Sequence, residues 1–564
     1  MRVSKWILTT VLLGLSAVVT WAQAGASPEK PAAGGTTNAA PDESARPTSL
    51  TELTDRIFKR EHDQVALFSL YRPIVETYIQ ELKKDREMGF VPSRDYYYLG
   101  QADLSHGLVD YSMLPRKGFW FTPELSVDYS PEFFIQATYV DRYRFDKQHY
   151  DLKYVGKAFL GDVRCFVFDA KPLPKAGREV FTGRIWVEDQ NYTIVRFNGV
   201  YLPQRSFLAV NAHFDSWRLN VQPDLWLPAF VFTQELNPKS FGANRFRGQT
   251  RFWGYSLNSV RHEEAFSDIF VDPSTNVQDD SAGRRDRAPI EAEREWQREA
   301  EENTMDSLVR DGLIAPEGPV DKILDTVLNN LIVTNNLNID PEPHCRVLLT
   351  SNIEAFSLNH TIVVSRGLLD VLPDEATLAT VLAEELSDAL VPKLGEDQYG
   401  FGDTAQVPTA KALKHFSFKD SREEWEATGE KAIALLRNSP YRDKLGTAGL
   451  FLKQLSADSK VLPHLIGANL GNQIYPVAEL LNSGQPLRPD EIKQIAALPL
   501  GARIKLDPWT DDVQLLQSKP AVLASAREKM PLEITPFMPY LTRYHKENGA
   551  ADAPDVASGS GGAK

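Results

Sequence analysis

Between Phe133 and Tyr255 the chain is a succession of short runs rich in β-branched and aromatic residues, each separated from the next by turn residues. Such runs predict strands, and a spacing of about ten residues favours one antiparallel sheet with few helices. This part of the chain is therefore expected to be a curved antiparallel sheet. The predicted strands are Phe133–Val140, Tyr150–Val155, Arg164–Ala170, Glu179–Glu188, Thr193–Val200, Ala209–Leu219, Trp226–Glu235 and Gly248–Tyr255.

The clearest unit is the hairpin Gly183–Phe197, which we expect to turn at Asp189-Gln190-Asn191. Its Gly-x-Ile-Trp-Val-Glu pattern and the strand order resemble the half-barrel of the LolA, LolB and RseB group of lipoprotein carriers and sensors. In that group a bent sheet wraps a hydrophobic cavity. The resemblance implies that aromatic residues give one face to a packed core or to a lipid or lipid-modified ligand, and both alternatives stay open. These aromatic residues are Phe134, Tyr139, Phe166, Phe168, Trp186, Phe197, Phe214, Trp217, Phe230 and Phe232.

Residues 381–390 have the frame of a zinc-protease helix in which both histidines are replaced by carboxylates. In an H-E-x-x-H helix the two histidines project from one face and hold zinc, and the glutamate is the general base. Here these positions are Glu384, Glu385 and Asp388, so the base is kept and both imidazoles are lost. None of the ten histidines in the chain forms a pair at i and i+4.

The residues around this helix resemble metallopeptidase family 48, which includes HtpX, the CAAX prenyl protease and BepA-like proteins. The match covers roughly residues 318–460 and depends on Ala355, Phe356, Leu358, Arg366, Gly367, Leu368, Leu369 and Ala383. It implies that Glu385 is the general base, and that Glu384, Asp388 and Glu424 occupy the metal-ligand positions. It also implies that the substrate strand runs along Glu354, Ala355, Phe356, Asn359 and His360, although Glu354 replaces an Asn and Asn359-His360-Thr361 shortens the following turn.

These replacements favour lost or altered chemistry at the predicted site. An all-carboxylate set suits Ca²⁺, Mg²⁺ or Mn²⁺ better than zinc. A general base alone does not carry hydrolysis, because a water without a metal is neither acidified nor held against the carbonyl. We therefore expect no cofactor, and zinc or another divalent cation is expected only if the chain is an active peptidase. The alternative to a bound cation is that these carboxylates are solvated or paired with basic residues such as Arg366.

The N-terminus indicates secretion. Met1–Lys5 is a short basic start, Trp6–Trp21 is an apolar run, and Ala22-Gln23-Ala24 is a small-x-small cleavage site, as in a secretory signal peptide. Beyond residue 24 no stretch has the length of apolar residues that a transmembrane helix needs. We therefore expect a periplasmic or extracellular protein without a transmembrane segment in the mature chain.

Composition excludes some classes of protein. The formal net charge of −14, without a basic stripe, makes the chain a poor partner for nucleic acid. Cys165 and Cys345 are the two cysteines, so a disulfide framework is excluded. We expect two buried thiols, and a single bridge between modules stays open in an oxidising compartment.

The predicted domain organisation follows from these segments. It comprises a signal peptide (1–24), a disordered leader (25–48), a helical segment (49–94), the carrier-like β domain (95–268), a linker (269–288), the peptidase-like domain (289–482), a C-terminal extension (483–547) and a disordered tail (548–564). The helical prediction rests on Ile57, Val65, Leu67, Leu70, Ile74, Tyr78 and Leu82, which recur at helical spacing between Leu50 and Lys84.

The sequence thus predicts an α+β multidomain protein, in which a curved antiparallel β half-barrel precedes a mainly helical gluzincin-like peptidase domain. The leading functional hypothesis is a non-catalytic binding, chaperone or sensor module for an envelope protein, an unfolded polypeptide or a lipidated ligand. The first alternative is an active metalloendopeptidase that uses carboxylate ligands. The second is a lipid or lipoprotein carrier in which the peptidase-like domain is a scaffold.

Overall fold

The computed structural model describes residues 47, 49–85, 89–104, 106, 108–110, 132–177, 179–202, 212–235, 245–257, 304–339, 342–358, 360–390, 422–467, 469–471, 474, 504–506, 509, 513–515 and 532–544. The chain divides into two compact units, Met1–Ser49 and Leu50–Lys564, and the helices and strands lie in the second. The predicted signal peptide, linker and C-terminal tail lie outside the described residues, and so does the leader apart from Pro47.

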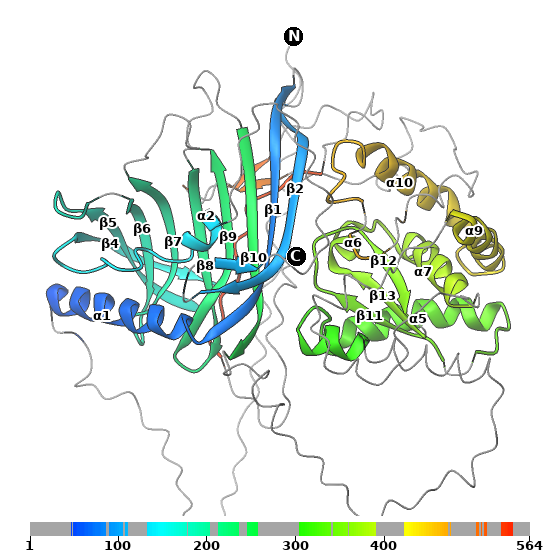
Figure 1. Ribbon diagram of the computed structural model, residues 1–564, viewed down its shortest axis with the longest axis horizontal. Coiled ribbons are helices and arrows are strands. Elements are labelled where there is room, and N and C mark those ends of the chain that lie inside the picture. Colours follow the sequence, from blue (N-terminus) through cyan, green and yellow to red (C-terminus); the bar gives the residue numbers. More distant parts are fainter. Residues whose placement is uncertain are drawn as a thin grey trace, which may run out of the picture. The chain divides into compact units, whose positions relative to one another are not determined.

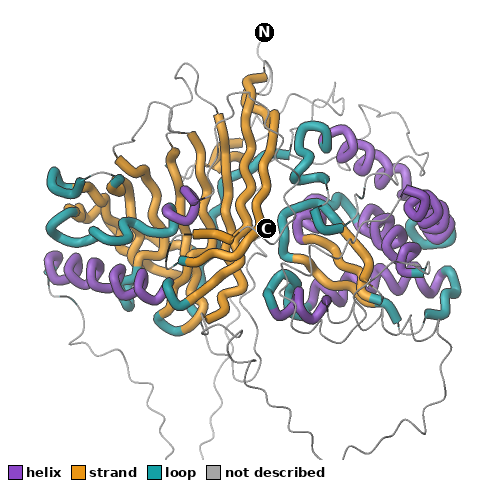
Figure 2. Tube along the Cα trace, in the orientation of Figure 1, coloured by secondary structure: helices purple, strands orange, loops and turns teal. Residues whose placement is uncertain are grey.

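The largest element is a ten-stranded antiparallel sheet with the order β3-β2-β1-β10-β9-β8-β7-β6-β5-β4 (Figures 1 and 2). Its strands are β1 (Tyr71–Asp85), β2 (Gly89–Asp103), β3 (Leu108–Asp110), β4 (Tyr150–Leu160), β5 (Val163–Pro172), β6 (Val180–Glu188), β7 (Ile194–Leu202), β8 (Ala212–Gln222), β9 (Leu225–Glu235) and β10 (Arg245–Leu257). Two meanders, β1–β3 and β4–β10, are joined by the pairing of β1 with β10. The predicted large antiparallel sheet is therefore confirmed, and the hairpin after Glu188 turns where we expected it.

The helical prediction for residues 49–94 is correct as far as Phe68 and wrong beyond it. Helix α1 ends at Phe68, and β1 and β2 follow it as paired strands. Ile74, Tyr78 and Leu82 recur every fourth residue, a spacing that fits both one side of a helix and alternate positions on one face of a strand. Pro73 was the available signal, because proline disrupts a helix interior.

The strand predicted at Phe133–Val140 is also wrong, since helix α2 (Glu132–Gln136) and turns occupy these residues. Phe134, Ile135 and Ala137 are nevertheless buried, at 2%, 1% and 0% exposure. They are buried by packing against the sheet and not by strand pairing. An apolar run alone does not distinguish these two ways of removing side chains from water.

The two faces of the sheet are covered differently. On the first, which we call the helical face, α1 (Leu50–Phe68) and α2 pack on alternate strand residues such as Ile79, Phe168, Val187 and Phe214. On the second, which we call the strap face, residues 532–544 lie across Tyr78, Trp186, Trp217, Trp226, Phe230 and Phe232. Successive residues of a strand point to opposite faces, so both covers are needed to bury a sheet that is apolar on both sides.

The remaining described elements form an α/β part. A small mixed sheet has the order β11-β13-β12, with β11 (His344–Leu348) parallel and β12 (Ala355–Leu358) antiparallel to β13 (Thr361–Ser365). Helices α5 (Pro319–Thr334), α6 (Arg366–Val371), α7 (Glu375–Ala389), α9 (Arg422–Arg437) and α10 (Leu445–Asp458) and the short 3-10 helix η4 (Arg442–Lys444) complete it. The strands β14 (Ile504–Leu506) and β15 (Val513–Leu515) form a separate two-stranded sheet. The mixed α+β class is confirmed, whereas the assignment of this part to the gluzincin peptidases stays a prediction.

Buried polar contacts join the α/β part to the large sheet. Glu76 of β1 accepts hydrogen bonds from the Ser351 backbone N–H at 2.6 Å, the Ser351 hydroxyl at 2.7 Å and the Tyr97 hydroxyl at 2.8 Å. Arg251 of β10 donates to Glu76 at 3.2 Å, and burial lowers the pKa of this guanidinium to about 10. Ile74 and Trp253 pack beside them against Phe356 and Leu470. No helix among the described residues is long and apolar enough to cross a membrane.

Candidate functional site

Helix α7 carries three of the predicted site residues. Asp374 caps its N-terminus, since the Asp374 side chain accepts a hydrogen bond from the Thr377 N–H at 2.9 Å. Glu384, Glu385 and Asp388 are 4%, 0% and 2% exposed, so the three carboxylates are buried. The Ser357 hydroxyl donates a hydrogen bond to Asp388 and thereby links β12 to α7.

The described donor set does not form a metal centre. Within the residues that the structure describes, no group of three or more His, Cys, Asp or Glu side chains is placed to hold a metal ion. The fourth predicted residue, Glu424, belongs to α9, but its side chain lies outside the described part. These carboxylates do not fit zinc, which prefers imidazole and thiolate, and the predicted metal-ligand roles stay predictions.

The predicted substrate strand corresponds to the start of β12. Ala355 and Phe356 are both fully buried, and both pair with β13. His360 lies in the turn, where its carbonyl accepts a hydrogen bond from the His344 N–H at 2.9 Å, and Asn359 lies outside the described residues. Strand β12 contacts α7, and the role of these residues as a substrate strand stays a prediction.

Glu354 holds a segment of the chain that is distant in sequence. Its Oε2 accepts hydrogen bonds from the backbone N–H groups of Asn469 at 2.8 Å, Leu470 at 2.8 Å and Gly471 at 3.1 Å. The segment also meets the edge of the small sheet directly, since the Ile353 N–H donates to the Leu465 carbonyl at 2.8 Å. A Cβ on Gly471 would lie 2.4 Å from the Ala355 carbonyl oxygen. Residues 464–467 and 469–471, which we call the clasp, therefore lie against the start of β12.

A second carboxylate holds the clasp from the other side. Asp95 of β2 accepts hydrogen bonds from the Leu465 N–H at 2.9 Å and from the His464 N–H at 3.1 Å. Burial raises the pKa of Asp95, and the two N–H donors and the charge of His464 oppose this rise. Asp95 and Glu354 are each 1% exposed, so the clasp bridges two buried carboxylates, one from each sheet.

The sequence did not predict that the clasp is held between Glu354 and Asp95. The pattern Gly467-Ala-Asn-Leu-Gly471 was a weak signal for a tight backbone approach. Nothing in the sequence indicated that Asp95, 369 residues before His464, would bind it. The replacement of Asn by Glu354 was read only as damage to a substrate strand, whereas the carboxylate has its own structural role here.

The aromatic residues of the predicted carrier-like sheet separate cleanly between its two faces. Phe134, Tyr139, Phe166, Phe168, Phe197 and Phe214 contribute to the helical face, and Trp186, Trp217, Phe230 and Phe232 contribute to the strap face. On the helical face, Arg218 of β8 makes a two-point ion pair with Glu61 of α1, with both side chains at most 1% exposed. The helical face is thus covered by a helix that is tied down by a buried ion pair.

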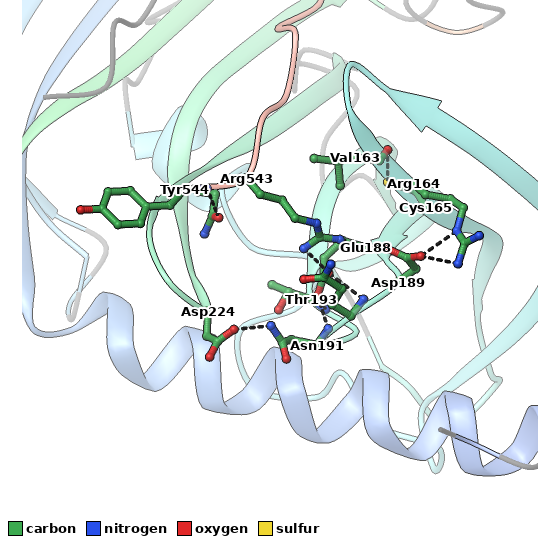
Figure 3. A network of polar contacts seen from close by, with 12 residues as sticks. Val163, Arg164, Cys165, Glu188, Asp189, Asn191, Thr193, Asp224, Arg543 and Tyr544 are labelled. Carbon is green, nitrogen blue, oxygen red and sulfur yellow. Dashed lines mark hydrogen bonds and ion pairs between the residues drawn. The ribbon is translucent and has the colours of Figure 1, made fainter. Parts of the chain in front are cut away.

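Residues 532–544, which we call the strap, are anchored along their whole length. Gln80 of β1 donates to the Leu532 carbonyl at 3.1 Å and accepts from the Ile534 N–H at 2.8 Å. At the other end, Arg543 donates to Glu188 and Asp189, each at 2.9 Å (Figure 3). Glu188 is fully buried, and its carboxylate also accepts hydrogen bonds from the backbone N–H groups of Gln190 and Asn191 in the following turn. The strap therefore spans from β1 to the turn between β6 and β7.

Both cysteines are free thiols in buried positions, as the sequence predicted. Burial and the nearby Glu188 charge raise the pKa of Cys165 to about 12, and burial with the Asp325 charge also raises the pKa of Cys345. Cys165 lies opposite Glu188 in the ladder of β5 and β6, and its thiol donates to the Val163 carbonyl at 3.6 Å (Figure 3). Neither thiol has the exposed, electropositive surroundings of a reactive cysteine.

Comparisons with known proteins give no family assignment. No model of a known protein family matches the chain, and no curated protein matches it. Among solved structures, a LolA superfamily protein from Nitrosomonas europaea has 10% identity over 37% of this chain and 94% of its own, with a TM-score of 0.21. A DUF1329 family protein from Desulfovibrio piger has 12% identity over 38% of this chain and 95% of its own, also with a TM-score of 0.21.

A third solved structure comes from Vibrio parahaemolyticus, and its description names it an outer membrane lipoprotein-sorting protein domain. It has 8% identity over 38% of this chain and 97% of its own, with a TM-score of 0.19. With TM-scores this low, the three likenesses carry no inference about this chain.

Proposed function

We propose that this protein is a non-catalytic binding protein of the cell envelope that takes an apolar or lipidated ligand on the helical face of its large sheet. The observation that carries the proposal is the construction of that face. Aromatic side chains of several strands, among them Phe168, Phe181, Phe197 and Phe214, form one continuous apolar surface under α1 and α2. Displacing the cover would offer this surface to an acyl chain, because apolar burial is non-directional.

Helix α1 covers the sheet without belonging to the strand ladder, and displacing it requires breaking the buried ion pair of Glu61 with Arg218. Helix α1 is amphipathic, and it buries Leu53, Ile57, Phe58 and Phe68 against the sheet while its other side is exposed. It contacts the sheet through side chains and is not itself a strand of it. A helix held in this way can move as a unit without breaking the strand ladder, whereas an added strand could not.

The packing around α7 supports the non-catalytic part of the proposal. Glu385 is fully buried, and Asp388 accepts the hydrogen bond of Ser357. The clasp lies against Ala355 and Phe356, where an incoming peptide strand would need space. Our proposal includes no metal ion and no hydrolytic step, and it gives the α/β part the role of a scaffold that is fixed to the sheet through Glu76 and Asp95.

The proposed location rests on the sequence of residues 1–24, whose basic, apolar and small-residue regions are typical of a secretory signal. A carrier of lipidated ligands acts where such ligands must cross an aqueous compartment, which agrees with a periplasmic or extracellular protein. The ligand itself is proposed only by its chemistry, as an acyl chain or an acylated polypeptide.

Ligand binding can be tested on the purified mature protein. Native mass spectrometry should detect a co-purifying lipid, or binding of a diacylated lipopeptide that the same peptide without acyl chains does not show. Amide hydrogen exchange in α1 should change on binding, whereas exchange in α5 serves as the internal control and should not. If no lipid co-purifies and no acyl-dependent binding is found, the proposed ligand is refuted.

The catalytic alternative is tested separately. Hydrolysis of an unfolded protein and bound metal should be measured for the native chain and for Glu385→Gln. We expect no metal and no difference between the two proteins. Stoichiometric metal, together with hydrolysis that disappears in Glu385→Gln, would establish the peptidase instead.

A further inference from the structure

We propose that the hairpin of β4 and β5 is a docking surface for an anionic lipid bilayer. The surface, which we call the rim, consists of Lys153, Tyr154, Val155, Lys157 and Phe159 on β4. This strand is the last in the order of the large sheet, at the left in Figure 1. Docking at the rim does not require a bound ligand, so this inference goes beyond the proposed function and can fail independently of it.

The apolar part of the rim is unusually exposed for ordered strand residues. Phe159, Val155 and Tyr154 are 70%, 46% and 39% exposed, although β4 is regularly paired with β5 around them. Tyr154 packs its ring edge on Phe168 of the helical face, with ring centroids 5.5 Å apart. Through Tyr154 the rim therefore continues the helical face to the surface, whereas Lys153, opposite Asp169, points to the other face of the hairpin. Exposed aromatic residues beside lysines are typical of side chains that settle at the headgroup level of a bilayer.

The charges near the rim favour an anionic partner. Two nearby carboxylates are paired with arginines, Asp169 with Arg184 at 2.9 Å and Asp189 with Arg164, and Asp151 of β4 is an exposed carboxylate. Lys153 and Lys157 are both exposed, and neither forms an ion pair with another residue in the described part of the chain.

Lys157 places its ammonium 5.7 Å from the ring centroid of Phe166, so its charge stands beside the exposed aromatic surface. An anionic headgroup can therefore meet a lysine while Phe159 enters the acyl region. This pairing of an apolar side chain with a neighbouring cation is what an anionic bilayer surface binds.

The backbone of β4 argues against a protein strand as the occupant. The ladder with β5 shifts register between Tyr154 and Gly156, which marks a bulge. A bulge and lysines on an edge strand are features that oppose the addition of a further strand. A lipid surface does not need a regular row of backbone donors and acceptors, so the same features leave it unaffected.

The test uses the full mature chain and vesicles of defined composition. Sedimentation with vesicles of equal parts phosphatidylglycerol and phosphatidylcholine should pull down the protein, and phosphatidylcholine vesicles should bind it at least tenfold more weakly. Binding to the anionic vesicles should weaken as salt increases. The double variant Lys157→Glu/Phe159→Ser should reduce binding to anionic vesicles by at least tenfold.

A matched control is offered by α5, where Lys322 is exposed and the adjacent Ile323 is 61% exposed. Lys322→Glu/Ile323→Ser makes the same change in charge and polarity outside the rim, so it should bind like the native protein. Thermal unfolding should show that both variants are folded. If the two variants bind anionic vesicles equally well, or if the native protein does not sediment with them, the proposal is wrong.

Light scattering after size-exclusion chromatography tests whether a second copy of the chain binds the rim instead. Self-association that Lys157→Glu/Phe159→Ser abolishes, without vesicle binding by the native chain, would identify the rim as an interface between copies and would overturn the membrane proposal.

Discussion

Glu61 in α1 and Arg218 in β8 are 157 residues apart in the sequence and form a buried two-point ion pair. Arg218 Nη1 lies 2.7 Å from Glu61 Oε2, and Nη2 lies 2.6 Å from Oε1. Arg218 also donates to the Ile194 carbonyl at 3.0 Å and lies over the ring of Phe68. One guanidinium thus fixes the covering helix to the centre of the sheet.

Breaking this pair on one side should be strongly destabilising. Glu61→Ala leaves the Arg218 charge buried without its carboxylate, which is expected to lower the free energy of unfolding by about 3–5 kcal/mol. Urea unfolding followed by circular dichroism measures this loss. The double variant Glu61→Met/Arg218→Met removes both charges and should recover much of it. A loss below about 1 kcal/mol for Glu61→Ala would show that the pair does not fix α1.

Glu354→Ala tests the anchor of the clasp. The substitution leaves the N–H groups of Leu470 and Gly471 buried without their acceptor, so stability should fall by at least about 2 kcal/mol. Amide exchange of the clasp should become faster, while α5 should be unaffected. Glu317→Ala is the control, because Glu317 pairs with Arg346 but is 79% exposed, and its loss should change stability by about 0.5 kcal/mol or less. Unchanged exchange in the clasp would contradict the anchoring role.

Gly471→Ala tests the close approach of the clasp to β12. The new Cβ would lie 2.4 Å from the Ala355 carbonyl oxygen and 2.7 Å from a ring carbon of Phe356. Because a backbone oxygen cannot move aside without moving β12, a destabilisation of about 1–3 kcal/mol is expected in chemical denaturation. At Gly156 a Cβ would meet nothing within 4 Å, so Gly156→Ala should stay within about 0.5 kcal/mol of the native protein. Equal effects of the two substitutions would refute the steric argument.

Arg543→Ala should loosen the C-terminal end of the strap. The substitution removes charge-assisted hydrogen bonds to Glu188 and Asp189, and an unfolding free energy lower by about 1.5–3 kcal/mol is expected. Limited proteolysis should then cut within 532–544 sooner. Arg442→Ala is the matched control, since Arg442 is 69% exposed and its partner Asp443 is 87% exposed. If cleavage of the strap is equally slow in both variants, Arg543 is not its anchor.

Thiol chemistry should report the burial of Cys165. Its pKa is raised from 9.0 to about 12, so the folded protein keeps a proton that the unfolded chain loses between these values. This contribution to stability is complete below pH 9 and is lost as pH rises toward 12. At pH 8 a thiol reagent should modify neither cysteine in the folded protein and both in denaturant. Alkaline unfolding of Cys165→Ala should be less steep than that of the native chain, and rapid labelling of the folded protein would contradict burial.

The sequence predicted most strands of the large sheet because their information is local. Runs such as Arg164–Ala170 and Trp226–Glu235 are recognised by β-branched and aromatic residues between turn residues, and the structure confirms them as β5 and β9. The cap Asp374 and the start of α7 were readable for the same reason. The regions that failed, 71–94 and 133–140, are those where the same apolar spacing fits more than one element and only tertiary packing selects between them.

The degenerate motif on α7 could be located from the sequence alone, since a helical spacing of carboxylates is a local property. What surrounds it could not, because Glu354, Asp95 and the clasp meet across more than 100 residues of chain. Likewise, alternation along a strand divides its residues between two faces, but the sequence does not say what covers either face. Only the tertiary structure places α1 on one face through Glu61 and the strap on the other through Arg543. These contacts join residues that are far apart in the sequence, and no local pattern indicates them.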